Sequence, residues 1–358
     1  MTLDSRDIMI LRLAAMYHRL PYRGVGRFGF GKGLEDELGI LSAAGMLKVS
    51  RDKEYMRPSP QAFDMLSGQG YDYARCADRP YNSRASLRRR LEAASIALTA
   101  LRAGIDPLPD GVGALSRQPV FLPAFALRAG GGNMMNAASC AGFGHWGGTG
   151  FMLHYVGPGG AGMYEANELG HLHNLSSLFD PGLGAPLALV LAGQCHASLH
   201  RQLSAQAPSK KHGRYGFRDF WDVYRRSDLP IHLLPCDETG AMQLAIMRQP
   251  GYRLRIAKAA LGPGWAPNVD GIPDADGSIG GSPLVIAADM DARRVGRICR
   301  AARQLGHEEV MVAALKSQVE SFYMPFMKGR GIRLLGITRR ILDDAFGESL
   351  PPCPLGGE

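Results

Sequence analysis

Along the first part of the chain, apolar residues recur at the spacing of amphipathic helices. Ile8 and Leu11 open a broad apolar face and predict a first helix, which Asp4 or Ser5 can cap. The segment 34–45, LEDELGILSAAG, has leucines three or four residues apart and predicts another helix that stops at a glycine. The stretch between them, YRGVGRFGFGKG, is dense in glycine and indicates a short broken helix or a loop.

Two short strands follow this second helix. Residues 46–50 and 54–57 alternate apolar and polar positions around the charged turn SRDKE. Ser59 and Pro60 then begin a further helix, with proline at the first helical position, where its missing N–H costs nothing. The order helix, strand, turn, strand and capped helix predicts a winged helix-turn-helix domain over residues 1–75.

In the rest of the chain the pattern of apolar and polar residues changes. Residues 76–110 predict a linker followed by a connecting helix, and residues 104–150 are so rich in glycine, alanine and proline that they indicate irregular structure with short strands. From Leu187 onward, buried-type strands such as LALVLAG, IHLLPCD and PLVIAAD alternate with helical patterns. This alternation predicts an α/β domain over 111–350 with a mostly parallel or mixed sheet, and a tail over 351–358.

Composition narrows the class of protein. The chain has 358 residues, of which 46% are hydrophobic, so it can form two domains with real cores. No apolar run approaches the roughly 20 residues of a membrane span, and the first residues, MTLDSRD, do not resemble a secretory signal. The six cysteines are widely spaced, which argues against a zinc ribbon or a disulfide framework. We expect a cytoplasmic protein with no membrane partner.

The net charge of +8 and the pI of about 9.3 suit a partner rich in phosphate. Double-stranded DNA is the partner that a winged helix predicts. The exposed side of the predicted recognition helix, however, carries Glu35, Asp36 and Glu37, which phosphates repel. A winged helix that serves dimerisation or protein contact therefore stays open as an alternative. The candidate phosphate contacts are Arg27, Lys32, Lys48, Arg51, Lys53, Arg57, Lys210, Lys211 and Arg214.

Motifs for cofactors and simple metal sites are weak. Gly157, Gly159 and Gly162 have dinucleotide-site spacing, but the following segment is too polar for the buried helix that such a site needs. His171 and His173 lack a matching ligand pair. No P-loop, hydrolase elbow or protease signature is present, so we expect no cofactor and favour a function without catalysis.

Asp289 and Asp291 are the most suggestive carboxylates, since they lie where a predicted strand ends and a helix begins. Two such groups could hold Mg²⁺, which prefers oxygen ligands. The segment resembles the D-x-D part of the Toprim domain of primases and topoisomerases, which implies a Mg²⁺-dependent nuclease or primase component as an alternative. That family also needs an earlier glutamate, for which Glu238 is a loose candidate, and Lys316 with Glu320 has the wrong spacing for a nuclease motif.

The order of elements through GMLKV…EYMRPSPQAFDML resembles the replication-relaxation-like winged-helix proteins of bacterial plasmids and integrative mobile elements. The segments IHLLPCDETGAMQLAIMRQPGY and EVMVAALKSQVESFYMPF add similarity to element-encoded proteins of that organisation. The resemblance implies a second domain related in shape to restriction endonucleases, without an obvious active site. It also implies a DNA-binding role in replication, transfer or regulation of a mobile element.

Overall fold

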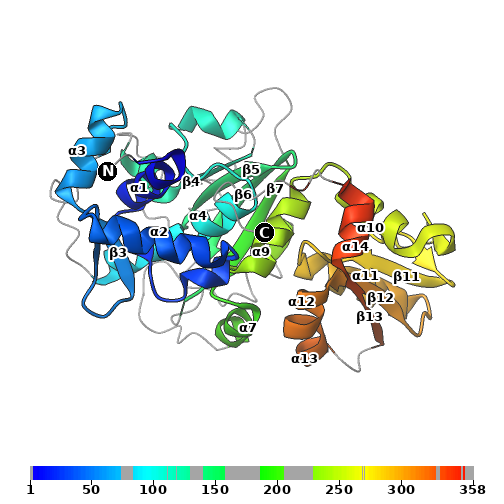
Figure 1. The fold of residues 1–358 in the computed structure, drawn as a ribbon. Helices are drawn as coiled ribbons and strands as arrows, with labels where there is room; N and C mark the ends of the chain where they lie inside the picture. The colour runs from blue at the N-terminus through cyan, green and yellow to red at the C-terminus, as the bar shows by residue number, and fades with distance from the viewer. Residues whose placement is uncertain are drawn as a thin grey trace.

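The computed structural model describes residues 3–73, 84–110, 112–117, 119–129, 140–157, 186–204, 229–267, 269, 271–327, 331–347 and 350. In these residues the chain forms three β-sheets with helices packed against them, so the predicted mixed α/β class is confirmed. In Figure 1 the N-terminal elements, a middle sheet and a C-terminal sheet follow one another from left to right.

Residues 3–73 form what we call the N-terminal module. Its order follows the predicted one, with one further short strand, β1, that was not predicted. Asp4 caps the first helix by accepting the N–H groups of Arg6 and Asp7, and Ser59 caps the third through Ala62. The three short strands form an antiparallel sheet in the order β1-β3-β2. The elements are α1 (Ser5–Tyr17), β1 (Leu20–Pro21), η1 (Val25–Phe28), α2 (Gly31–Ala43), β2 (Leu47–Val49), β3 (Tyr55–Pro58) and α3 (Pro60–Gly68).

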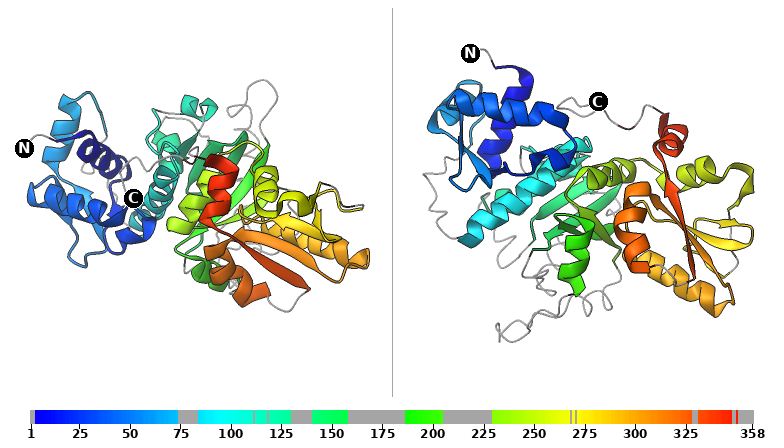
Figure 2. Two further views of the ribbon diagram at one scale, coloured as in Figure 1. Left: turned by 45° about the vertical axis from the view of Figure 1, so that its right-hand side comes forward. Right: turned by 60° about the horizontal axis from the view of Figure 1, so that its bottom comes forward.

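The predicted connecting helix is α4 (Arg84–Arg102), and it lies in the core. Figure 2 shows it running between the N-terminal module and the middle sheet. Ala93, Ala97 and Leu101 are almost fully buried in a hydrophobic cluster that also holds residues of α1, α2 and the middle sheet. The helix therefore joins two parts of one core, which a flexible linker would not do.

The middle sheet has its strands in sequential order, β4-β5-β6-β7-β8. Strand β5 is antiparallel to both of its neighbours, whereas β6, β7 and β8 run parallel. The described helical elements of this region are α5, α7 and α9, with the short turn η3. Their bounds, with those of the strands, are η3 (Val112–Ser116), β4 (Val120–Pro123), α5 (Ala124–Ala129), β5 (Gly142–Trp146), β6 (Thr149–Tyr155), β7 (Leu187–Gly193), α7 (His196–Ser204), β8 (Ile231–Pro235) and α9 (Glu238–Met247).

The C-terminal sheet has the order β13-β12-β11-β10-β9, with β11, β12 and β13 parallel. The predicted single α/β domain thus contains two five-stranded sheets. The elements are α10 (Tyr252–Leu261), η5 (Gly262–Gly264), β9 (Trp265–Ala266), β10 (Ser278–Ile279), β11 (Ser282–Ile286), α11 (Ala292–Gln304), β12 (Val310–Leu315), α12 (Lys316–Gln318), the π-helical turn η6 (Val319–Tyr323), α13 (Met324–Met327), β13 (Ile332–Ile337) and α14 (Arg339–Phe346).

The two large sheets are joined directly. The N–H of Leu233 on β8 donates to the carbonyl of Met290, 3.2 Å away, and His232 forms an isolated bridge with Asp291. The turn after β11 thereby extends the edge of the middle sheet. In the part of the chain that the structure describes, no helix has the length and apolar character needed to cross a bilayer.

Candidate functional site

The hairpin of β2 and β3, residues 47–58, which we call the wing, carries a group of exposed cations. Lys48 on β2 lies directly opposite Arg57 on β3. Arg51 and Lys53 occupy the turn between the strands, and all four side chains are exposed. Within the described residues none of the four has an ion pair or hydrogen bond from its side chain. The wing therefore presents to solvent four cations without ion-pair partners among the described residues.

The two acidic residues of the wing, Asp52 and Glu54, interact with groups other than these four cations. The Asp52 carboxylate accepts the Ser50 hydroxyl at 2.5 Å and the N–H of Glu54 at 3.2 Å. The hydrogen bond from Ser50, followed by that from Glu54, lowers the pKa of Asp52, so it stays ionised. Glu54 itself pairs with Arg23 at 3.3 Å. Asp52 therefore organises the turn, and among the described residues its carboxylate forms no ion pair with the neighbouring Arg51 or Lys53.

The other predicted phosphate contacts divide into two groups. Arg27 is half-buried: its Nε donates to the carbonyl of Cys236 at 3.2 Å, and its guanidinium lies over Phe28. Arg27 thus joins the N-terminal module to the loop after β8, a role that the sequence did not indicate. Lys32 lies in the first turn of α2, and its side chain is outside the description. Lys210, Lys211 and Arg214 fall outside the described residues.

The second helix of the module, α2, exposes a mixed acidic and apolar side. Glu35 and Asp36 are exposed as the sequence predicts. Glu37 is partly buried and pairs with Arg6 at 2.7 Å, so it is not on the free surface. Ile40, on the exposed side, has a relative accessibility of 55%. The carboxylates of Glu35 and Asp36 would repel phosphate on this side of α2.

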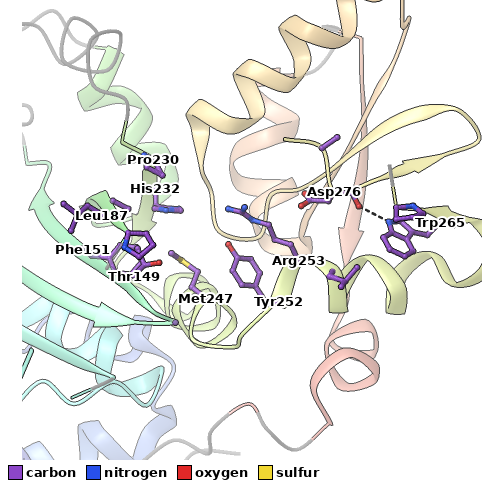
Figure 3. A pocket seen from close by; sticks show the side chains of 17 residues that line it. Thr149, Phe151, Leu187, Pro230, His232, Met247, Tyr252, Arg253, Trp265 and Asp276 are labelled. Carbon is purple, nitrogen blue, oxygen red and sulfur yellow. Dashed lines mark hydrogen bonds between the residues drawn. The ribbon is translucent and has the colours of Figure 1, made fainter. Parts of the chain in front are cut away.

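A cleft of about 520 Å³ opens between the middle sheet and the C-terminal sheet. Its middle-sheet wall comes from the starts of β6, β7 and β8, and its other wall from the start of α10 and the loops around β9. Figure 3 shows His232 on one wall and Arg253 on the other facing each other, with Tyr252 beside them. The cleft thus combines apolar walls with a small polar cluster, the usual composition of small-molecule sites.

The carboxylates of Asp289 and Asp291 lie behind this cleft and are buried. Asp289 Oδ2 accepts the Tyr252 hydroxyl at 2.5 Å and Arg253 Nη2 at 2.5 Å, and Oδ1 accepts the N–H of Asp291. Burial alone would raise the pKa of Asp289, but Arg253, then His232 and Arg294, hold it well below its usual range. A Toprim-like site needs carboxylate oxygens open to a cation, and these oxygens already have protein donors.

The backbone of the turn that contains Asp289 and Asp291 also takes part in hydrogen bonds. The carbonyl of Asp289 accepts His232 Nδ1 at 2.9 Å and Gln243 Nε2 at 3.0 Å. Asp291 caps α11 by accepting the N–H of Arg294. Met290 between them has a φ of 53°, a left-handed conformation that costs energy for a side chain with a Cβ. The turn therefore holds the two sheets together.

The remaining motif residues are dispersed. Glu238 lies near the N-terminal module, since its Cγ would be 2.9 Å from a Cβ placed at Gly29. Among the described residues no hydrogen bond or ion pair joins it to Asp289. Lys316 and Glu320 form an exposed ion pair at 3.9 Å one helical turn apart. Among the described residues no group of histidines, cysteines and carboxylates has metal-binding geometry. Gly159, Gly162, His171 and His173 lie outside the described residues.

The cleft residues were missed by the sequence analysis. Arg253 and Asp289 are 36 residues apart, and His232 is 57 residues from Asp289, so no local spacing connects them. The single available signal was the Pro250-Gly251 break, which predicts that a new helix begins at this point.

The chain matches no protein-family model, no curated protein and no solved structure.

Proposed function

We propose that the chain is a DNA-binding protein whose N-terminal module acts as a winged helix on duplex DNA. The observation that carries the proposal is the placement of Lys48 directly opposite Arg57 on paired strands. Like charges in this arrangement are destabilising, and a bound phosphate would offset the repulsion. Arg51 and Lys53 extend the same charge around the turn. The wing would therefore contact the DNA backbone.

The acidic side of α2 decides the mode of binding. Glu35 and Asp36 would face phosphates if α2 entered the major groove, so we assign the main contact to the wing. Backbone contacts give affinity that falls with salt and carry little sequence information. The net charge of +8 favours the same partner.

For the rest of the chain, we propose that the middle sheet is the restriction-endonuclease-like element that the family resemblance implies. Its five strands in sequential order, with β5 antiparallel to its neighbours, support that assignment. Its role would be to position the wing on DNA or on a partner. The context of mobile-element replication, transfer or regulation rests on the resemblance.

The test is Lys48→Glu, measured by fluorescence anisotropy with generic duplex DNA at several salt concentrations. The new glutamate would pair with Arg57 across the strands, so wing stability should be unchanged or higher by a few tenths of a kcal/mol. DNA affinity should fall. The slope of log affinity against log salt concentration should become shallower by the equivalent of about one to two phosphate contacts.

Arg300→Glu is the matched control, because Arg300 is exposed on α11 and lacks an ion pair among the described residues. It makes the same charge change away from the wing. Equal losses of affinity for the two variants would mean that net charge alone drives binding, and the wing would not be the contact surface. No salt-sensitive binding by the wild-type protein would reject the DNA-binding function.

A second candidate function is protein contact through α2, either in a homodimer or with another protein. The 55% exposed Ile40 favours it, because it lies on the side of α2 that phosphate would avoid. If α2 forms a homodimer, Ile40→Asp should convert a dimer into a monomer in light scattering after size exclusion. A wild-type protein that is monomeric at high concentration would reject the homodimer.

A further inference from the structure

The start of α10 in the cleft has unused hydrogen-bond donors. Gly251, with a φ of 63°, precedes the helix, and no side chain caps it. The N–H groups of Arg253 and Leu254 have no acceptor among the described residues, whereas that of Tyr252 donates to the Gln249 carbonyl at 3.3 Å. Free N–H groups and the helix dipole favour an anion here.

His232 supplies an independent indication of a ligand. The side chain lines the cleft and is only 5% exposed. Its Nδ1 lies 2.9 Å from the Asp289 carbonyl, which can only accept, so Nδ1 carries the proton. Nε2 is then left without a partner in the described part of the chain. Figure 3 shows the ring directed across the cleft toward Arg253.

Arg253 completes the polar end of the cleft. Its Nε and Nη2 donate to Asp289, at 3.1 and 2.5 Å, which fixes the guanidinium plane. The third nitrogen, Nη1, has no acceptor among the described residues, and the side chain is 34% exposed. The pair with Asp289 compensates the charge of Arg253, so this group offers a positioned donor more than a net charge.

The rest of the cleft suits a flat group with hydrogen-bonding edges. Phe151, Tyr252 and Trp265 contribute aromatic side chains to its lining, and its volume is that of a small-molecule site. Asp276 also lines it; Oδ2 accepts from Arg294 and from the N–H of Ile286, while Oδ1 has no donor within the described residues. Its negative charge, offset by Arg294, would repel a phosphate placed beside it. The phosphate therefore belongs at α10 and the flat group nearer to Asp276.

We propose that this cleft binds a nucleoside 5′-phosphate. The phosphate oxygens accept the N–H groups of Arg253 and Leu254 and the Nη1 donor, and His232 Nε2 accepts from a phosphate hydroxyl. The base lies along Trp265, and the free Asp276 oxygen accepts from an amino group. A nucleoside 5′-phosphate group occurs both in a free mononucleotide and at the 5′ end of a nucleic-acid strand.

The experiment is a calorimetric titration of the full-length protein with AMP, adenosine and inorganic phosphate, with tryptophan fluorescence as a second readout. We expect AMP to bind more tightly than either fragment, because it uses both ends of the cleft. A short single strand with and without a 5′-phosphate separates the two sources. If the phosphorylated strand binds more tightly than both AMP and the unphosphorylated strand, and Leu254→Glu removes that difference, the site is assigned to strand ends. Tighter binding of AMP assigns it to free nucleotides.

Two variants and one control locate the binding. Leu254→Glu places a carboxylate in the first turn of α10, which favours the helix but occupies the anion position; Leu254 is 47% exposed, so the fold should tolerate it. His232→Asn keeps a donor for the Asp289 carbonyl and removes Nε2. Each should weaken AMP binding about tenfold or more, the loss expected for one hydrogen bond to a charged group. Ile40→Glu adds the same single negative charge at an exposed apolar position of α2 and should leave AMP binding unchanged.

Several results would overturn the proposal. One is the absence of heat and fluorescence change with AMP at millimolar concentration. Another is equal binding of AMP and adenosine, which would remove the phosphate from the site. A third is unchanged AMP affinity in Leu254→Glu, or equal loss in Ile40→Glu. None of these results depends on the wing, so they leave the DNA-binding proposal to its own test.

Discussion

At the scale of single residues, Asp289 is held by Arg253 and Tyr252 in a fully buried position. Asp289→Asn removes the charge and keeps the shape, so it leaves Arg253 and Tyr252 with a weaker acceptor. We expect a loss of about 2 kcal/mol in the free energy of unfolding at neutral pH, measured by urea denaturation. Asp274→Asn is the control, because its ion pair with Arg297 is exposed and should contribute at most about 1 kcal/mol.

The pH dependence of that loss follows from the depressed pKa of Asp289. A carboxyl whose pKa is lower in the folded state stabilises the protein above its unfolded pKa of about 3.9. That stabilisation disappears as the pH falls toward the folded value. The difference between wild type and Asp289→Asn should therefore be constant near neutrality and shrink below about pH 4. A difference that stays constant into acid would contradict the ionised, protein-bound carboxylate.

Glu92 on α4 shows the opposite behaviour. Burial raises the pKa of Glu92 to about 7, and the lowering effects of Arg88, 3.1 Å away, and Arg89 offset it only in part. The folded state therefore holds its proton more tightly than the unfolded chain, and stability falls as the pH rises from about 4.5 to about 7. Glu92→Gln should be more stable than wild type at pH 8 by about 1 to 3 kcal/mol and equal to it at pH 4. Thermal unfolding at both pH values checks this, with the exposed Glu320→Gln as the unresponsive control.

At the scale of elements, two helical glycines should respond oppositely to alanine. In α9, a Cβ at Gly240 would overlap the Pro235 carbonyl oxygen, so the helix packs closely on the end of β8. Gly240→Ala should cost about 2 to 4 kcal/mol of folding free energy despite the better helix propensity of alanine. In α2, Gly39 has open space around it, and Gly39→Ala should stabilise by up to about 1 kcal/mol. Equal changes in the two urea midpoints would contradict this close packing.

The same local contacts explain which elements could be predicted. Strands β7, β8 and β11 and helix α4 were confirmed because their apolar patterns are local. The glycine-rich stretch 104–150 was predicted as irregular with short strands, and it forms β4, β5 and the first two residues of β6, which pair in one sheet. There, Gly144 leaves room for the Trp146 ring and Gly142 lies against the Leu122 carbonyl. Tertiary packing requires these glycines, so propensity alone could not identify the sheet.

The candidate sites show the same limit. The exposed wing cations could be predicted, since alternation in a hairpin determines which side faces solvent. The buried role of Arg27 could not be, because its acceptor on Cys236 is 209 residues away. The polar end of the cleft likewise depends on one turn after β11 meeting the starts of β8 and α10. Contacts between segments so far apart in the sequence depend on how the two sheets pack, which local patterns do not reveal.

At the scale of the whole molecule, the hydrophobic clusters do not follow the sheets. One cluster runs from the N-terminal module through α4 to one face of the middle sheet. Another joins the opposite face of the middle sheet to the C-terminal sheet. Hydrogen bonds cross the first boundary as well: Tyr17 donates to the Pro107 carbonyl at 2.9 Å, and Arg102 donates to that of Gly29 at 2.9 Å. A wing bound to DNA would therefore hold the middle sheet in a fixed orientation.

The sequence suggested a domain boundary at residue 75. Because the hydrophobic core is shared across it, we expect that the first domain does not fold alone. A fragment of residues 1–75 lacks α4, whose Ala93, Ala97 and Leu101 complete the core of α1 and α2. We expect the fragment to expose that face and to melt without a cooperative transition in circular dichroism. In the full-length chain, tryptophan fluorescence and far-ultraviolet dichroism should report one coincident transition. A fragment that melts sharply and binds duplex DNA as the full chain does would show that the wing needs no support from the middle sheet. The fixed orientation inferred from the shared core would then lose its physical basis.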